Sequence, residues 1–497
     1  MTGILSRRMF LGAGLAALAA PVPVRAEAPA RSLRPMARPA RGAVAGPPGP
    51  QALIAGARLS GRVGYAVVDP ATGRLLEAHD GDAAMPPASI AKALTALYAL
   101  DALGEGHRFE TRLIATGPVE NGILKGDLVL AGGGDPTLDT NALAGMAAAL
   151  KAGGLREVRG RFRVWGGAVP YRRAIVEDQP EHAGYNPALS GLNLNFNRVH
   201  FEWKRQGDSY AIRMDARSDR YRPDVGVARM RVAERAAPVY VHADGGARDE
   251  WSVARAALGN GGARWLPVRK PELYAGEVLA TFARAQGIVL GTPEMMSQAP
   301  SGSVLVSHRS EALAPILRDM LRHSTNLTAE MVGMTASARR QGASVTWAQT
   351  AAMMNGWAAA RLGMGAAALR DHSGLSDRSR LTASDMARGL AGAPRAALLR
   401  PLLRDFALRD ARGNVARDHP VKVRAKTGTL YFVSTLAGYV TTASGRDLAF
   451  AILTASDSLR ARIDPKTDDS PPGARDWNRR ARRLQQALIE RWSTVHG

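Results

Sequence analysis

Three short strings of reactive residues occur in order along this 497-residue chain. They are Ser89-Ile90-Ala91-Lys92, Ser324-Thr325-Asn326 and Lys426-Thr427-Gly428-Thr429. A serine hydroxyl is a weak nucleophile unless a base lies beside it, and a lysine serves as that base only while it is neutral. Residues three apart on a helix are neighbours, so Lys92 can reach Ser89. Residues 93–100 are apolar on nearly every side, which predicts a buried helix that disfavours the charged form of Lys92.

Each string alone has an ordinary structural explanation. Ser89 could be a helix N-cap, and Lys426 could be a solvated strand lysine. Ser324 and Asn326 could lie in a polar loop between two helices. The ordered combination is harder to obtain by chance, since Lys92 is one of only eight lysines. We therefore interpret the three strings together as parts of one catalytic site.

Three further strings narrow this interpretation. They are Leu130-Ala131-Gly132-Gly133-Gly134-Asp135-Pro136-Thr137-Leu138, Leu194-Asn195-Phe196-Asn197 and Asp371-His372-Ser373-Gly374-Leu375-Ser376. With the first set they resemble the penicillin-binding proteins and serine β-lactamases, whose signature is Ser-x-x-Lys, Ser-x-Asn and Lys-Thr-Gly. The three further strings look like those of the class C low-molecular-mass penicillin-binding proteins, which are D-alanyl-D-alanine carboxypeptidases and endopeptidases. The resemblance extends from about residue 50 to the end, with His372 where that family usually has Gly.

Chemistry and the resemblance together imply a role for each residue. Ser89 would attack the carbonyl between two D-alanines while Lys92 takes its proton, and Ser324 would pass a proton to the leaving amine. The expected catalytic residues are Ser89, Lys92 and Ser324, and the expected substrate-binding residues are Asn326, Lys426, Thr427, Gly428 and Thr429. Backbone N–H groups of Ser89 and Thr429 would form the oxyanion hole. We expect neither a metal nor a cofactor.

The predicted function is that of a serine D-alanyl-D-alanine carboxypeptidase and endopeptidase. It would act on peptidoglycan stem peptides through an acyl-enzyme on Ser89 and would be inhibited by penicillin and other β-lactam antibiotics. One alternative is a β-lactamase-like hydrolase, but the chain lacks the Glu-x-x-Leu-Asn string that would place a deacylating water. A second alternative is a catalytically weak wall-binding or sensing protein with a vestigial site. Covalent labelling by penicillin would separate these classes.

The N-terminus predicts where this chemistry takes place. Arg7 and Arg8 precede a short apolar run, residues 11–20, which is too short to span a bilayer and is typical of a twin-arginine (Tat-type) export signal. We predict an export signal over residues 1–26, a disordered linker over 27–50 and a periplasmic location. A Sec signal or an uncleaved anchor is the alternative. We expect no transmembrane helix in the mature chain, although arginines of the linker could contact anionic lipid peripherally.

Composition excludes several other classes of site. The formal net charge is +22 and cysteine is absent, so disulfides and thiolate metal sites cannot form. In an exported protein this positive charge favours anionic wall polymer or membrane over nucleic acid. Codon bias is the alternative and the larger cause of this charge, because arginine greatly outnumbers lysine, 58 against 8. Gly132-Gly133-Gly134 lacks the following Gly-Lys-Ser/Thr of a phosphate loop, and the ten histidines include no His-Glu-x-x-His pattern.

The strand and helix patterns predict an α/β fold whose catalytic domain is split by an insertion. Residues 64–79 form a predicted hairpin, residues 421–453 three predicted antiparallel strands, and residues 476–492 a covering helix. More than 200 residues separate Lys92 from Ser324, and this stretch alternates apolar and polar residues. We predict a catalytic domain of the penicillin-binding-protein and β-lactamase type over 51–115 and 303–497, an antiparallel sheet flanked by helices. The β-rich insertion would cover 116–302 as two nested modules, which the resemblance implies.

Overall fold

The computed structural model describes residues 46–410, 412–464 and 470–497. The described residues from Pro48 to Gly497 form one compact unit. The predicted export signal, residues 1–26, and most of the predicted linker lie outside the described residues. Near the end of the predicted linker, Pro50 begins helix α1 (Pro50–Ala57). In the described part of the chain, no helix combines the length and apolarity that a membrane span requires.

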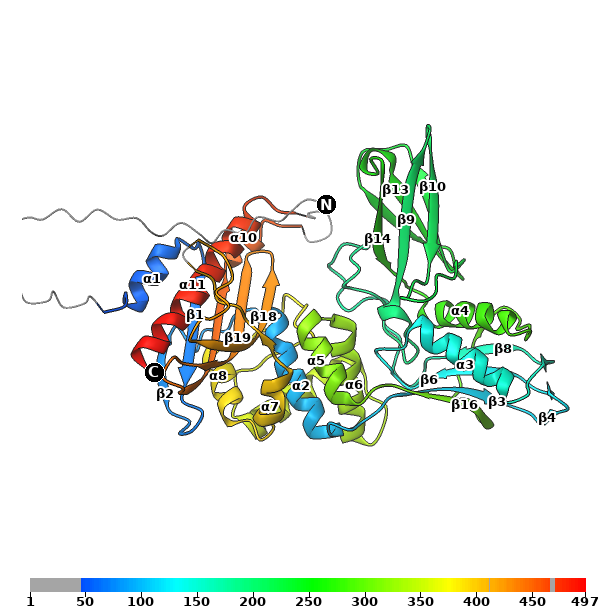
Figure 1. The fold of residues 1–497 in the computed structure, drawn as a ribbon, viewed down its shortest axis with the longest axis horizontal. Coiled ribbons are helices and arrows are strands. Elements are labelled where there is room, and N and C mark those ends of the chain that lie inside the picture. Colours follow the sequence, from blue (N-terminus) through cyan, green and yellow to red (C-terminus); the bar gives the residue numbers. More distant parts are fainter. Residues whose placement is uncertain (1–45, 411, 465–469) are drawn as a thin grey trace, which may run out of the picture. The chain divides into compact units, whose positions relative to one another are not determined.

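A six-stranded antiparallel sheet underlies the region that carries the three strings (Figure 1). Its order is β17 (Arg404–Asp405), β18 (Lys422–Leu430), β19 (Val433–Thr441), β20 (Asp447–Ala455), β1 (Arg62–Val68) and β2 (Leu75–His79). Strand β1 pairs with β20 along its whole length, from Arg62 opposite Ala455 to Val68 opposite Ala449. The early hairpin and the late strands therefore form one sheet, as the sequence predicts.

The two faces of this sheet are covered by different helices because side chains alternate along each strand. On β1, Tyr65 and Val67 join the apolar cluster that includes Leu488 and Trp492 of α11 (Ala474–Val495). Ala66 and Val68 point to the opposite cluster, which contains α2 (Ala91–Leu103) and α8 (Ala383–Gly392). The sheet is thus the middle layer between two helical layers.

Helix α2 is buried on all sides from Ala91 to Leu100. Its neighbours are α5 (Leu313–His323), α6 (Asn326–Gln341) and α7 (Trp347–Leu362), whose apolar residues share its cluster. The predicted buried helix after Lys92 is confirmed. A polar side chain that projects from the first turn of such a helix is shielded from water unless a cleft opens beside it.

Between α2 and α5 the chain builds a separate, β-rich region with its own apolar core. A five-stranded sheet has the order β15 (Glu294–Met295), β8 (Phe162–Trp165), β6 (Leu128–Gly132), β3 (Glu110–Ala115) and β16 (Ser303–Arg309), and it packs with α3 (Thr140–Ala152) and α4 (Pro271–Ala285). The region also contains two three-stranded sheets. The first has the order β10 (Ser209–Asp215), β9 (Arg198–Gln206), β14 (Gly261–Pro267), and the second has the order β11 (Ala228–Ala233), β13 (Asp249–Ala254), β12 (Tyr240–Asp244).

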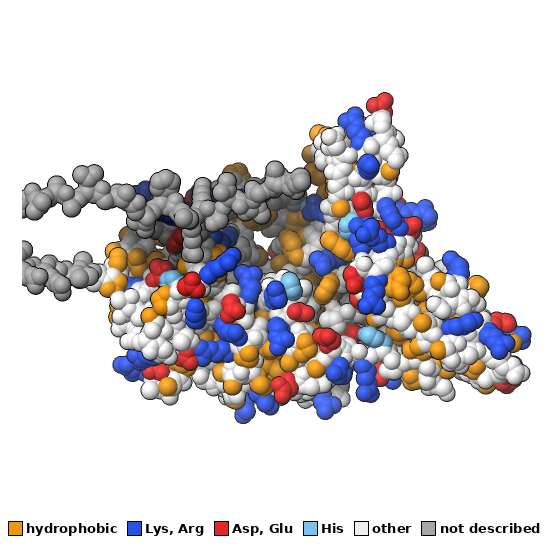
Figure 2. Space-filling model, viewed as in Figure 1, with side chains coloured by type: hydrophobic (Ala, Val, Ile, Leu, Met, Phe, Trp, Pro, Cys, Tyr) orange, Lys and Arg blue, Asp and Glu red, His pale blue; other side chains and the backbone are white. Residues whose placement is uncertain are grey.

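The remaining elements are short. They are β4 (Val119–Glu120), β5 (Ile123–Leu124), β7 (Glu157–Val158), α9 (Ala396–Leu399), α10 (Asp457–Arg460) and the 3-10 turns η1 (Ala88–Ile90), η2 (Asn195–Asn197), η3 (Arg255–Ala257) and η4 (Arg400–Leu402). Figure 2 shows basic side chains on one face dispersed among acidic and apolar ones.

The predicted α/β class with a β-rich insertion is confirmed, and the pairing of the strands suggests different boundaries for the insertion. Strands β3 and β16, which the prediction assigned to the catalytic domain, pair with each other and with β6 in the five-stranded sheet. The strands that leave and re-enter the catalytic region therefore belong to the insertion. We propose boundaries near residues 109 and 310 in place of 115 and 303.

Candidate active site

Ser89 lies in the 3-10 turn η1, directly before α2 begins. Strand β18 passes close to this turn at Gly428. A Cβ added to Gly428 would lie 2.1 Å from Thr435 Oγ1 and 2.9 Å from the Ser89 nitrogen. Only a residue without a side chain fits there, so Gly428 allows the Lys-Thr-Gly strand to run against the serine.

Lys92 is fully buried, and its ammonium nitrogen has three partners. Nζ lies 3.0 Å from Ser89 Oγ, 2.7 Å from Asn326 Oδ1 and 2.8 Å from the Ser373 carbonyl oxygen. The amide and carbonyl oxygens can only accept hydrogen bonds, whereas the serine hydroxyl can also donate. A neutral amine with two hydrogens and one lone pair fits this set, because it donates to the two acceptors and turns its lone pair toward Ser89.

Burial lowers the pKa of Lys92 to about 8, and the nearby Asp371 and Glu330 carboxyl groups act in the opposite direction. The desolvation of the ammonium outweighs the attraction of the two carboxyl groups. A substantial fraction of Lys92 is therefore neutral just above neutral pH. The group has the protonation behaviour that a base for Ser89 needs.

Ser324 and Lys426 form a second pair across the cleft. Ser324 is the residue between α5 and α6, in the left-handed region at φ 59°, which turns the chain so that α6 can begin at Asn326. Lys426 on β18 donates to Ser324 Oγ at 3.0 Å and to the Thr427 carbonyl at 2.7 Å. Lys426 is 2% exposed, and burial followed by the charge of Lys92 lowers its pKa. Two lysines thus share one site, each bonded to a serine.

Beneath Lys92 lies a buried loop whose peptide groups connect it to two carboxylates. The Ser373–Gly374 peptide accepts a hydrogen bond from Lys92 at its oxygen and donates its N–H to Asp371 Oδ1 at 3.0 Å. Asp371 also accepts from the Ser376 N–H and from Ser379 Oγ, at 2.6 and 3.1 Å. Its surroundings consist of donors, which favours the carboxylate, although burial and Glu330 raise its pKa. The peptide dipole therefore transmits the charge of Asp371 to Lys92.

Glu330 supports the same loop from α6. Its carboxylate accepts the N–H groups of His372, at 3.1 Å, and Ser373, at 2.9 Å. The His372 carbonyl in turn accepts from Thr95 Oγ1 on α2 at 2.6 Å. The loop is thereby fixed to both α2 and α6, which keeps the Ser373 carbonyl aimed at Lys92.

His372, the departure from the family pattern, is accommodated without loss of these bonds. Its ring is buried against Gly333 of α6, where an added Cβ would lie 2.2 Å from His372 Cγ. The ring stacks on Tyr98, with centroids 6.5 Å apart and planes at 9°, and Nδ1 lies 3.3 Å from Met354 sulfur. Burial lowers the pKa of His372 to about 4, so the ring is neutral. The histidine ring occupies space that Gly333 leaves free, while its main-chain N–H and carbonyl bind Glu330 and Thr95.

The insertion contributes one wall of the cleft. The side-chain amide of Asn326 donates to the Tyr185 carbonyl at 2.9 Å, and Tyr185 lies in the inserted region. A cavity of about 1120 Å³ is lined by Ser89, Tyr185, Ser324, Asn326 and Thr429, among others. The structure thus brings Ser89, Ser324, Asn326 and Thr429 to one cavity. Lys92 and Lys426 are buried and are hydrogen-bonded to the two serines.

Glu330 and Tyr185 belong to the site although the sequence did not single them out, and Ser373, which lies in the Asp371–Ser376 string, contributes its main-chain carbonyl. Glu330 follows Asn326 by four residues and so lies on the same side of α6, a spacing that could have drawn attention to it. For Tyr185 there is no such local signal.

One cluster outside the cleft has the residue types of a metal site. His200, Glu202 and Asp215 of β9 and β10 offer ligand atoms within 4.8 Å of one another. Arg217 already donates to Glu202 at 2.6 Å and to Asp215 at 3.0 Å. The guanidinium supplies the positive charge that these carboxylates attract, so the cluster is an ion-pair network.

The fold and the cleft define a serine acyltransferase of the penicillin-binding-protein type, with a Ser-Lys pair beside a second serine and lysine. The chain belongs to the D-Ala-D-Ala carboxypeptidase 3 (S13) family, whose model matches residues 51–469. It is therefore a serine-type peptidase of the D-alanyl-D-alanine carboxypeptidase class, as the sequence predicts.

Individual relatives agree with this assignment. The chain is 30% identical over 440 residues to the D-alanyl-D-alanine carboxypeptidase of Actinomadura sp. (strain R39), with 81% of this chain and 79% of that protein covered. It is 25% identical over 421 residues to D-alanyl-D-alanine carboxypeptidase DacB of Haemophilus influenzae, with 78% and 84% covered. The crystal structure of penicillin binding protein 4 (dacB) from Haemophilus influenzae superposes with a TM-score of 0.72 at 20% identity, over 89% of this chain and 100% of that one.

Proposed function

We propose that the chain cleaves D-alanyl-D-alanine ends of peptidoglycan stem peptides, and related cross-links, through an acyl-enzyme on Ser89. The observation that carries this proposal is the 3.0 Å approach of Lys92 Nζ to Ser89 Oγ, with the other two partners of Lys92 being acceptors. Ser89 Oγ attacks the carbonyl of the penultimate D-alanine, and its proton passes to Lys92. The bond to the terminal D-alanine then breaks, and the Ser324 hydroxyl delivers a proton to the leaving amine. Water hydrolyses the ester.

The Lys-Thr-Gly strand and Asn326 bind the substrate. We assign the terminal carboxylate to Lys426, Thr427 and Thr429, and the substrate amide to Asn326. The backbone N–H groups of Ser89 and Thr429 stabilise the tetrahedral oxyanion, each contributing about 3 kcal/mol. Gly428 keeps that strand within reach of the serine.

The carboxylate site explains why both peptidase activities fit one cleft. A cross-link between D-alanine and a diamino acid offers a carboxylate on the D-centre next to the scissile bond, as the terminal D-alanine does. The substrate class is therefore an acyl-D-alanine followed by a residue with a neighbouring carboxylate. β-Lactams carry a carboxylate next to a strained amide, and a structure of the Haemophilus influenzae protein is described as complexed with a novel β-lactam. We propose that β-lactams acylate this chain too.

Digestion of purified peptidoglycan tests the proposed substrate. Separation of the muropeptides should show tetrapeptides rising at the expense of pentapeptides, and monomers rising at the expense of cross-linked dimers. Ser89→Ala is the matched control and should produce neither change. If the wild-type protein binds penicillin but leaves the muropeptides unchanged, a sensing or wall-binding role replaces the peptidase.

We further propose that the chain is exported to the periplasm by the twin-arginine route. The support is Arg7-Arg8 before a short apolar run, which is a sequence pattern outside the described residues. A substrate in the cell wall requires such a location.

A further inference from the structure

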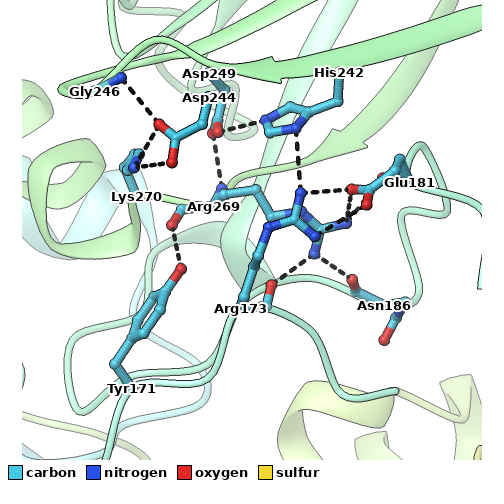
Figure 3. Close-up of polar contacts among 10 residues, drawn as sticks. All are labelled: Tyr171, Arg173, Glu181, Asn186, His242, Asp244, Gly246, Asp249, Arg269 and Lys270. Carbon is cyan, nitrogen blue, oxygen red and sulfur yellow. Dashed lines mark hydrogen bonds and ion pairs between the residues drawn. The ribbon is translucent and has the colours of Figure 1, made fainter. Parts of the chain in front are cut away.

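Arg269 is a buried arginine of the insertion that the reaction itself does not use. It lies between β14 and α4 and is 2% exposed. Its guanidinium donates to three main-chain carbonyls, those of Arg173 at 2.8 Å, Asn186 at 2.8 Å and Glu181 at 2.9 Å (Figure 3). One side chain thus supplies the hydrogen-bond donors for three backbone carbonyl groups.

These carbonyls belong to one irregular stretch, residues 171–186, which we call the wall segment. It contains no helix and only a single bridge, so its backbone groups need partners from elsewhere. The Asn186 side chain bonds the Val176 N–H and carbonyl, at 3.0 and 2.8 Å. Arg173 and Glu181 form a two-pronged ion pair with both distances at 3.0 Å. Figure 3 shows Arg269 beside the Arg173–Glu181 ion pair and bonded to Asn186.

Arg269 is itself fixed through its main chain, on one side by the sheet behind it and on the other by the wall segment. Its main-chain N–H donates to Asp249 Oδ2 at 2.8 Å, and its carbonyl accepts from the Tyr171 hydroxyl at 3.0 Å. Asp249 is fully buried, and its Oδ1 lies 2.8 Å from His242 Nε2. Since a carboxylate accepts, His242 carries its proton on Nε2, which leaves Nδ1 to accept from Arg173 at 3.4 Å. The β11-β13-β12 sheet therefore serves as a rigid anchor for the guanidinium.

The wall segment reaches the catalytic base through one side chain. Asn186, whose carbonyl Arg269 binds, directly follows Tyr185, whose carbonyl accepts from Asn326 Nδ2 at 2.9 Å. An asparagine amide has its NH2 group and its oxygen on opposite sides, so fixing the NH2 group also aims the oxygen. That oxygen accepts from Lys92 at 2.7 Å.

We propose that Arg269 is a positioning residue for acylation, because it holds the wall segment so that the Tyr185 carbonyl orients Asn326 toward Lys92. This inference rests on the proposed role of Ser89 and Lys92. On this proposal the insertion lines the cleft and also orients a residue that binds the catalytic base. Losing this orientation misplaces the base, and misplacements of about 1 Å cost on the order of 100-fold in rate.

The direct test compares Arg269→Gln with Lys270→Gln by the rate constant for acylation by a fluorescent penicillin. Lys270 is the adjacent cation in the same network, and it bonds Asp244 at 2.9 Å. We expect the acylation rate constant of Arg269→Gln to fall on the order of 100-fold, whereas Lys270→Gln stays within about twofold of wild type. Equal rates for Arg269→Gln and wild type would overturn the proposal. If Arg269→Gln is not folded, Arg269→Lys is measured instead and the same fall is expected. The lysine ammonium cannot reach three carbonyls at once.

A double-mutant cycle with Asn326→Ala separates positioning from a general loss of structure. If Arg269 acts through Asn326, its replacement should slow acylation far less in the Asn326→Ala background than in the wild type. Fully additive effects would contradict the proposed route. A wild-type protein that penicillin does not label would instead refute the proposed function, so the two failures are distinguishable.

Discussion

At the scale of single residues, the site depends on how Lys92 is kept neutral without being left unbonded. Burial disfavours its ammonium form, while Asp371, through the Ser373–Gly374 peptide, favours it. The balance places the pKa of Lys92 at about 8. A purely apolar pocket would lower the pKa further but would leave the two amine hydrogens without acceptors, which costs roughly 1–3 kcal/mol for each unpaired group.

The pH dependence of acylation should therefore report Lys92. Below a pH of about 8 the base is mostly protonated, so the acylation rate by penicillin should rise through that pH. Asp371→Asn removes the anion that raises the pKa of Lys92. The rise of the acylation rate with pH should therefore occur at a lower pH in this variant. Measuring the acylation rate against pH for both proteins checks this, with Asp101→Asn, on the last turn of α2, as a matched control. If the rate of Asp371→Asn rises at the same pH as that of the wild type, the charge of Asp371 does not affect the pKa of Lys92.

The residues of the three strings could be predicted because each carries a local signature. Ser89 and Lys92 are three apart on a helix start, and Lys426 precedes a Thr-Gly pair on a strand. Tyr185 and Arg269 could not be predicted, since Tyr185 acts through its main-chain carbonyl and Arg269 binds the main-chain carbonyls of other residues, groups that every residue possesses. Their roles depend on long-range packing that no spacing in the sequence records.

At the scale of elements, the cleft exists because β18 lies against the start of α2. Gly428 is the contact that permits this approach, and Ser324, at the turn between α5 and α6, faces the same strand through Lys426. The predicted hairpin, late strands and buried helix all formed as expected, because their apolar periodicity is strong. The edges of the insertion do not follow from the pattern, since β3 and β16 have the same alternation of apolar and polar residues whether they belong to one sheet or the other.

Gly428→Ala should separate β18 from Ser89 and lower acylation on the order of 100-fold, because the added methyl group overlaps the Thr435 hydroxyl and the Ser89 nitrogen. Gly356→Ala in α7 is the matched control, as nothing lies within 4 Å of its added Cβ. It should leave acylation unchanged and raise the free energy of unfolding by roughly 0.5–1 kcal/mol. Thermal unfolding and penicillin acylation of both variants check the pair. Wild-type acylation by Gly428→Ala would mean that the close approach is not needed.

At the scale of the whole molecule, an inserted β-rich region and a split catalytic domain meet at the cleft. The sequence predicted that the surplus between Lys92 and Ser324 must fold, because a connection of that length is too long for a simple loop. It did not predict that part of the surplus would line the cavity at Tyr185. The positions of long connections over a cleft depend on tertiary contacts, such as those of Arg269.

Export is a property of the whole chain and can be tested independently of the site. Changing both Arg7 and Arg8 to Lys should leave precursor in the cytoplasm if the twin-arginine route is used. Fractionation followed by immunoblotting measures the distribution, and a Sec-dependent reporter in the same cells controls for general secretion. Unchanged export of the double variant would exclude the twin-arginine route and leave the wall substrate unaffected.

The most direct test of the Ser89–Lys92 centre is to identify the residue that a fluorescent penicillin acylates. The purified folded protein should take up one penicilloyl group by intact mass, and peptide mapping should place it on Ser89. Lys92→Ala, once a thermal unfolding transition shows that it is folded, should be acylated more slowly by orders of magnitude. Ser89→Ala should remain unlabelled. A folded wild-type protein that takes up no label, or a label that persists in Ser89→Ala, would contradict the assignment of Ser89 as the nucleophile.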